Sequence, residues 1–151
     1  MGIEKDIHQS TFVSARHKSM VNLLYTYGWI MEQIKAFLAK EDITHQQFNI
    51  LRILRGAGGP LSTLQIRSRM LDKMSDTSRI VDRLVAKEWA QKVTCPKDKR
   101  LVDVTITDKG LKLLKKLDAQ SEDMQHIMDN LTEAEAEHLS NLLDKIRGTK
   151  A

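Results

Sequence analysis

The segment from 61 to 110 constrains the fold of this chain more than any other. It follows the run Gly56-Ala57-Gly58-Gly59-Pro60, in which glycine and proline end a preceding helix. Residues 62–70 and 75–88 form two short stretches with apolar residues at helical spacing. Residues 93–95 and 101–107 are typical of strands, and the turn between them is polar apart from its proline. The segment therefore predicts two short helices followed by a β-hairpin.

Positive charge is concentrated on this same segment. Residues 61–100 hold ten Lys or Arg against five acids, whereas residues 113–151 hold five against eight. Binding to the phosphates of a nucleic acid needs such a concentration of positive charge, and a uniformly solvated surface does not. A helix pair can place one helix in a DNA major groove, and a basic hairpin can reach the flanking backbone or minor groove. We therefore expect double-stranded DNA as the partner.

Candidate DNA contacts lie on the polar face of the helix expected at 75–88 and on the hairpin turn. Serine and threonine near a helix N-terminus can donate to phosphates, and arginine can bind guanine or a phosphate. The same side chains could instead cap the helix or form surface ion pairs worth under about 1 kcal/mol. The sequence does not divide base contacts from phosphate contacts. The candidates are Lys73, Ser75, Thr77, Ser78, Arg79, Arg83, Lys97, Asp98, Lys99 and Arg100.

The rest of the chain predicts long helices. The first is expected at 10–39, with an apolar stripe wide enough for part of it to face a second subunit. Gly28 inside it indicates a close contact or a bend. A long helix with a heptad-like seam is expected from Asp108 to Leu131, and a last helix from Glu133. Capping boxes predict three helix starts, at Thr44 with Gln47, Ser62 with Gln65 and Thr132 with Glu135. The expected fold is mainly α with a small β-hairpin.

Several classes of protein fit the sequence poorly. No apolar run approaches the roughly 20 residues that span a bilayer, and no secretory signal is visible, which favours a cytoplasmic protein. No phosphate-binding glycine loop, nucleophile elbow or carboxylate pair marks a catalytic residue, and the scattered histidines indicate neither a metal site nor a cofactor. The one cysteine, Cys95, is interpreted as structural or incidental. The alternative is a thiol sensor, because the neighbouring cations could lower its pKa.

The order of these elements resembles the MarR family of winged helix-turn-helix transcription regulators, from about residue 12 to 147. The resemblance rests on four short motifs in one order and spacing. They are Gln-Phe-Asn-Ile-Leu-Arg-Ile-Leu at 47–54, Ser-Arg-Ile-Val-Asp-Arg-Leu at 78–84, Asp-Lys-Arg at 98–100 and Val-Thr-Ile-Thr-Asp-Lys-Gly at 104–110.

The resemblance implies a single domain, 1–151, in which segments 1–40 and 111–151 form dimerisation helices and 44–110 forms the DNA-binding lobe. Members of the family are homodimers that place a recognition helix in the major groove, here the helix from Ser75, and a wing arginine in the minor groove, here Arg100. Residues 93–104 match the wing, and Asp98 matches the acid that holds a recognition-helix arginine, here Arg83. Two features depart from the family. Glu88-Trp89 replaces a common glycine-apolar pair, and the N-terminal cysteine of the redox-sensing branch is absent.

The resemblance also implies a possible small, often aromatic effector bound between the dimer helices and the DNA-binding lobe. His17, Tyr27 and Trp29 are the candidate ligand contacts. We therefore expect a homodimeric, sequence-specific DNA-binding regulator, a repressor, whose DNA affinity a small ligand modulates. The alternative is a winged-helix dimer that binds a protein or ligand without sequence-specific DNA contact. The basic segment 61–100 favours the first hypothesis.

Overall fold

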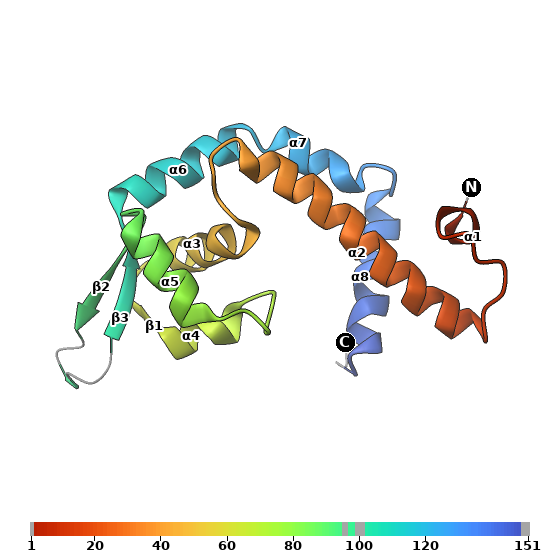
Figure 1. The fold of residues 1–151 in the computed structure, drawn as a ribbon, viewed down its shortest axis with the longest axis horizontal. Helices are drawn as coiled ribbons and strands as arrows, with labels where there is room; N and C mark the ends of the chain where they lie inside the picture. Colours follow the sequence, from red (N-terminus) through yellow and green to blue (C-terminus); the bar gives the residue numbers. More distant parts are fainter. Residues whose placement is uncertain (1, 95–96, 99–101, 149–151) are drawn as a thin grey trace. The chain divides into compact units, whose positions relative to one another are not determined.

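The computed structural model describes residues 2–94, 97–98 and 102–148, and within them the chain is mainly helical with one small antiparallel sheet (Figure 1). The helices are α1 (Ile3–Asp6), α2 (Ala15–Ala39), α3 (His45–Ala57), α4 (Thr63–Arg69), α5 (Thr77–Ala86), α6 (Asp108–Ala119), α7 (Glu122–Gln125), the 3₁₀ turn η1 (His126–Met128) and α8 (Glu133–Ile146). The strands are β1 (Leu61–Ser62), β2 (Ala90–Thr94) and β3 (Val102–Ile106), in the order β1-β3-β2. The expected fold class is confirmed. No helix of the described residues is long and apolar enough to cross a membrane.

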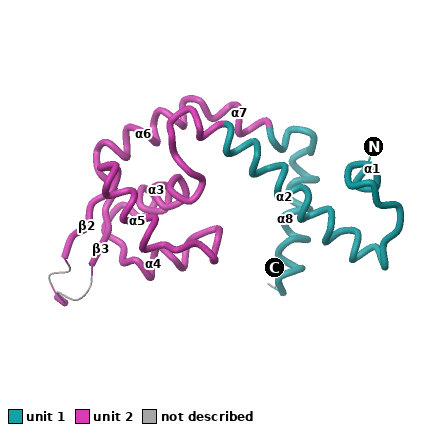
Figure 2. The backbone as a smooth tube through the Cα atoms, in the orientation of Figure 1, with its two compact units in different colours: residues 1–36, 127–151 teal, residues 37–126 magenta. Residues whose placement is uncertain are grey.

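The chain divides into two compact units, residues 1–36 with 127–151, and residues 37–126 (Figure 2). The second unit holds the core, in which α3, α4, α5, α6 and the sheet bury apolar side chains. The most deeply buried are Leu38, Ile50, Leu51, Leu54, Ile66, Val81, Leu84, Val104, Leu114 and Leu117. In the first unit, Ile3 is the one buried side chain among the described residues.

All three expected capping boxes are present. In each, the hydroxyl of the first residue accepts the backbone N–H three residues on, and the Gln or Glu there accepts the N–H of the first residue. These pairs satisfy backbone groups that a helix start leaves free, which is why α3, α4 and α8 begin where the sequence predicts.

The expected helix at 10–39 begins later, at Ala15. The Ser14 hydroxyl accepts the N–H of His17 at 3.1 Å, so the chain is capped there, and a separate short helix, α1, precedes it. Gly28 lies inside α2 with no atom within 4 Å of an added Cβ. The close contact expected at Gly28 is therefore not made within this chain.

The expected continuous helix from Asp108 to Leu131 was wrong, because α6 ends at Ala119 and α7 and η1 follow as short turns. Ser121 stands in the apolar seam that Leu114 and Leu117 begin, so the buried stripe is interrupted. The last amides of α6 form tighter bonds, from Gln120 to Leu117 and from Ser121 to Asp118.

The helix expected at 75–88 is α5, which is shorter at both ends. Asp76, not Ser75, caps it, because the Asp76 carboxylate accepts the N–H of Arg79 at 3.3 Å. At the C-terminus Glu88 has a left-handed backbone with φ of 64°. The N–H groups of Glu88 and Trp89 bond back to the carbonyls of Val85 and Leu84 at 3.0 Å each. This is a Schellman end with glutamate where glycine is the usual residue.

The hairpin strands also differ from the expected ranges. β2 begins at Ala90, earlier than the expected 93–95, and pairs with β3 from Ala90 opposite Ile106 to Thr94 opposite Val102. After Ala90 the side chains of β2 are exposed on both faces, so no alternation marks the strand in the sequence. β3 ends before Thr107 because Thr107 caps α6, and the short strand β1, which the sequence did not indicate, pairs with the other side of β3.

Candidate nucleic-acid interface

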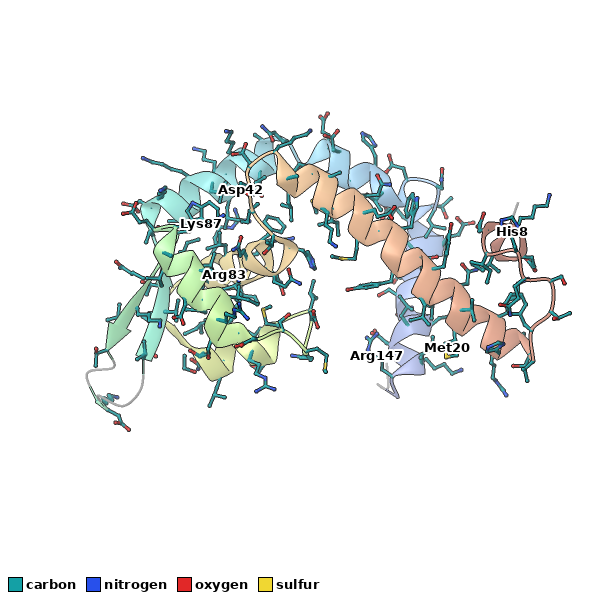
Figure 3. All side chains as sticks on the ribbon, viewed as in Figure 1. His8, Met20, Asp42, Arg83, Lys87 and Arg147 are labelled. Atoms are coloured by element: carbon teal, nitrogen blue, oxygen red, sulfur yellow. The ribbon has the colours of Figure 1, made fainter. Side chains whose placement is uncertain are left out.

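Helix α5 has one buried face and one polar exposed face. Val81 and Leu84 are buried in the core, whereas Ser78, Arg79 and Arg83 are exposed. Among the described residues, neither Arg79 nor Arg83 makes an ion pair or a side-chain hydrogen bond. Both guanidinium groups are therefore available to a ligand. Figure 3 shows Arg83 projecting from α5.

An ion pair connects α5 to the hairpin. The Nζ of Lys92 on β2 donates to the carboxylate of Asp82 on α5, and both side chains are largely exposed. Within the described part of the chain, no ion pair joins Arg83 to Asp98, the pairing that the resemblance implies. The sequence did not predict this ion pair, because Lys92 was considered only as one of the cations of residues 61–100.

Three of the expected DNA contacts, near the start of α5, do not present freely exposed polar groups. Lys73 is exposed, and its Nζ donates to the carbonyls of Ser68 and Arg67, the end of α4. Thr77 is only 4% exposed, so it is not part of the freely exposed face of α5, although it lines a hollow between α4 and α5. Ser75 is half-buried, and neither its buried Oγ nor Oγ1 of Thr77 has a hydrogen-bond partner in the described part of the chain.

The hairpin tip is described only at two positions. Lys97 is exposed and Asp98 is half-buried. The candidates Lys99 and Arg100, and also Cys95, lie outside the described residues.

The C-terminal end of α5 is held by Lys87. Its Nζ donates to the main-chain carbonyl of Asp42 at 2.7 Å and lies 3.6 Å from the Asp42 carboxylate. The same ammonium lies 4.7 Å from the centre of the Trp89 ring, a cation–π contact. Figure 3 labels Asp42, Lys87 and Arg83, with Lys87 at the end of α5 nearer Asp42. Lys87 thus fixes the end of α5 to the loop before α3.

The three candidate effector contacts lie in the first unit. His17 accepts the N–H of Val13 at its Nδ1 and packs beside Phe12, with ring centres 5.9 Å apart. Tyr27 and Trp29 are exposed on α2, 60% and 43% respectively. Their role in ligand binding stays a prediction.

One histidine of the second unit has a shifted pKa. His45, at the start of α3, is half-buried, and burial lowers the pKa of its imidazole below the ordinary value of 6.5. The charge of Asp72 opposes this shift.

Comparison with known proteins identifies the family. Residues 43–102 match the model of the MarR family. The multiple antibiotic resistance protein MarR of Salmonella typhimurium is 31% identical over 112 residues, which are 73% of this chain and 77% of that protein. The chain belongs to the MarR family. The HTH-type transcriptional regulator PecS of Dickeya dadantii, a further relative, is 28% identical over 111 residues, 72% of this chain and 67% of PecS.

Solved structures agree with this MarR-family fold. The crystal structure of a mutant MarR from E. coli, complexed with operator DNA, has a TM-score of 0.78 at 24% identity. The match covers 90% of this chain and 99% of that one. The stretch matched to the MarR family model runs from just before α3 to the first residue of β3, and so includes α3, α4, α5 and β2. The family resemblance expected from the sequence is confirmed.

Proposed function

We propose that this MarR-family chain is a transcription regulator that binds a specific double-stranded DNA sequence as a homodimer and acts as a repressor. The observation that supports this best is the exposed face of α5. It presents Arg79 and Arg83, free of ion pairs within the described chain, beside a hairpin that carries further cations.

In this proposal α5 enters the major groove and the hairpin lies along the flanking DNA. Arginine can donate two hydrogen bonds to guanine or hold a phosphate, and Ser78 can donate to either. Arg100, which follows Asp98 in the sequence, is assigned to the minor groove, where a narrow A·T tract attracts an inserted arginine. The ion pair between Asp82 and Lys92 supports a fixed spacing of helix and hairpin, because it joins α5 to β2.

We assign the contact with a second copy of the chain to the first unit, residues 1–36 with 127–151. That unit buries almost none of its apolar side chains in the single chain. The exposed ones on α2 and α8 include Met20, Leu24, Tyr27, Trp29, Leu142 and Ile146. Apolar faces of this extent are typical of protein interfaces. A two-fold dimer presents two copies of α5 about one helical turn of DNA apart, which requires a pseudo-palindromic operator.

The proposal includes regulation by a small effector and assigns no catalytic step. An effector changes the DNA affinity only if it binds one spacing of the two lobes more tightly than another. His17, Tyr27 and Trp29 remain its proposed contacts.

A fluorescence-anisotropy titration tests the DNA proposal. The duplex comes from just upstream of the chain's own gene, and a scrambled duplex of the same composition is measured beside it at two salt concentrations. We expect tighter binding to the upstream duplex and a steep loss of affinity with salt, because released counterions drive phosphate binding. Equal, weak and salt-insensitive binding to both duplexes would overturn the proposal.

Variants that each remove one positive charge test which residues contact DNA. Arg83→Gln and Arg100→Ala are expected to weaken binding about tenfold or more, because each removes a charged hydrogen bond to DNA. Lys115→Gln, at an exposed position on α6, removes the same charge away from the interface and is expected to bind like the wild type. Equal affinity of all four proteins would exclude the assigned face.

A further inference from the structure

A hollow of about 230 Å³ lies between α4 and the start of α5. It is lined by Thr63, Leu64, Arg67, Ser75, Asp76, Thr77 and Ser78. The two contributing helices are those of the helix-turn-helix, and residues of α4 were not among the contacts that the sequence predicted. The chemistry of this lining points to an anion.

The first donors are backbone groups. Thr77 and Ser78 are the first two residues of α5, a helix of ten residues. Their N–H groups have no acceptor within the described chain, because Asp76 accepts from Arg79 instead. Free N–H groups at a helix start carry partial positive charge and favour a bound anion.

Two hydroxyl groups provide an independent indication. Among the residues that the structure describes, Ser75 Oγ and Thr77 Oγ1 have no hydrogen-bond partner although they are buried, and Thr77 as a whole is 4% exposed. A buried hydroxyl without a hydrogen-bond partner destabilises the folded protein. Rotation about one side-chain bond changes the direction of either hydroxyl, so an anion in the hollow can supply the missing acceptor.

The charges around the hollow limit the type of anion. Arg67 is exposed and its guanidinium makes no ion pair among the described residues. Asp76 contributes one negative charge at the rim. Because the two charges offset each other, the backbone and hydroxyl donors suit a singly charged phosphodiester better than a free phosphate with two charges.

We propose that this hollow holds one phosphodiester of the DNA backbone, bound jointly by Arg67 of α4 and by the N–H and hydroxyl groups at the start of α5. The inference rests on the proposed function and adds α4 to the contact surface. A phosphate held at this point fixes the position of α5 along the groove. The exposed arginines Arg79 and Arg83 then meet base edges in one register.

The first test compares Arg67→Gln with Arg69→Gln. Both arginines are exposed on α4, but Arg69 does not line the hollow. Arg67→Gln is expected to weaken binding to the upstream and scrambled duplexes alike, by about tenfold, and to reduce the slope of log affinity against log salt by about one. Arg69→Gln is expected to change neither quantity. Identical slopes for the two variants would overturn the proposal.

The second test uses Thr77→Val, which replaces the buried hydroxyl with a methyl group of similar size. We expect this variant to unfold at a higher urea concentration, because the unpartnered hydroxyl is gone, yet to bind DNA more weakly. If the Thr77 hydroxyl had only a structural role, the stability to urea and the DNA affinity would change in the same direction. Higher stability with unchanged affinity would remove the hydroxyl from the proposed contact.

Duplexes in which single phosphates are replaced by uncharged methylphosphonates locate the contact. One replacement that weakens wild-type binding is expected to have little effect on Arg67→Gln. If every replacement affects both proteins equally, the hollow holds no DNA phosphate. Inorganic phosphate alone, titrated by calorimetry without DNA, tests the other source: phosphate binding by the wild type but not by Arg67→Gln, together with methylphosphonate effects that are equal in both proteins, would assign the hollow to free phosphate and overturn the DNA assignment.

The two proposals fail in different ways. If the wild type binds neither duplex, the proposed function is wrong. If the wild type binds the upstream duplex tightly and Arg67→Gln, Thr77→Val and Arg69→Gln all bind equally well, only the phosphate site is wrong.

Discussion

At the scale of single residues, the neighbouring backbone limits which side chain one position can hold. Gly110, at the start of α6, shows the strongest constraint, because an added Cβ would lie 2.3 Å from the carbonyl oxygen of Trp89 and 2.8 Å from Cγ1 of Ile106. The Trp89 carbonyl is also held by a hydrogen bond from the N–H of Thr107 at 3.0 Å. Moving the Trp89 carbonyl away from an added Cβ would break this hydrogen bond between the end of α5 and the cap of α6.

Gly110→Ala is therefore expected to destabilise the fold by about 1–3 kcal/mol, the usual cost of overpacking. Gly56→Ala is the matched control, because Gly56 lies inside α3 with no atom within 4 Å of an added Cβ. That variant should be stabilised by up to about 1 kcal/mol through better helix propensity. Urea unfolding measures both, and a Gly110→Ala protein as stable as the wild type would contradict the close approach.

His45 makes stability depend on pH. Its folded pKa lies below its unfolded pKa, so the unfolded chain binds a proton more readily. Stability is then complete above the ordinary pKa of 6.5 and falls as the pH drops from that value toward the folded pKa. His45→Gln is expected to flatten this part of a plot of unfolding free energy against pH. An unchanged slope in that variant would show that another group is responsible.

Helix α5 is held by one contact midway along it and one at its C-terminal end, and these contacts come from separate elements. Asp82 pairs with Lys92 on β2, and Lys87 reaches Asp42 in the loop after α2. Removing either contact loosens the helix without touching its exposed arginines.

Lys87→Met is expected to lower stability by about 0.5–1.5 kcal/mol, through the lost hydrogen bond to the Asp42 carbonyl and the lost contact with Trp89. Lys109→Met is the control, because Lys109 pairs with Glu88 at 3.4 Å on an exposed surface, where an ion pair is worth little. Thermal unfolding followed by circular dichroism separates the two variants. Equal losses would indicate a nonspecific effect of removing a lysine.

Local sequence signals predicted the starts of α3, α4 and α8 and the type of most elements, because a capping box acts within four residues. The ends of α5 and α6 depended on more distant or weaker factors. The glutamate at position 88 adopts a backbone that its sequence does not favour, since the Schellman bonds hold it there. At the site, charge and helical spacing found Arg79 and Arg83, but the burial of Thr77 and the hollow beside Arg67 depend on how α4 packs against α5.

Across the whole molecule, the two compact units differ in how they are stabilised. Residues 37–126 contain the apolar core, whereas the other unit leaves Leu24 67% exposed and Ile146 66% exposed. If a second copy covers these side chains, the melting temperature must rise with protein concentration, because association favours the folded form.

Leu24→Lys is expected to shift the chain toward the monomer and to remove this concentration dependence. Gln33→Lys adds the same charge at an exposed position on the opposite side of α2 and should remain dimeric. Analytical ultracentrifugation measures the assembly and calorimetry the melting temperature. A wild type that sediments as a monomer at all concentrations would contradict the dimer.

The near absence of buried side chains from residues 1–36 and 127–148 also bears on the lifetime of the protein in a cell. A newly made chain that has not met a second copy offers proteases two poorly protected ends. We expect brief trypsin digestion of a dilute sample to leave a fragment close to residues 37–126, and concentrated samples to survive intact. Degradation would then remove unpaired chains first. A given decrease in the rate of synthesis would therefore lower the amount of regulator by a larger factor.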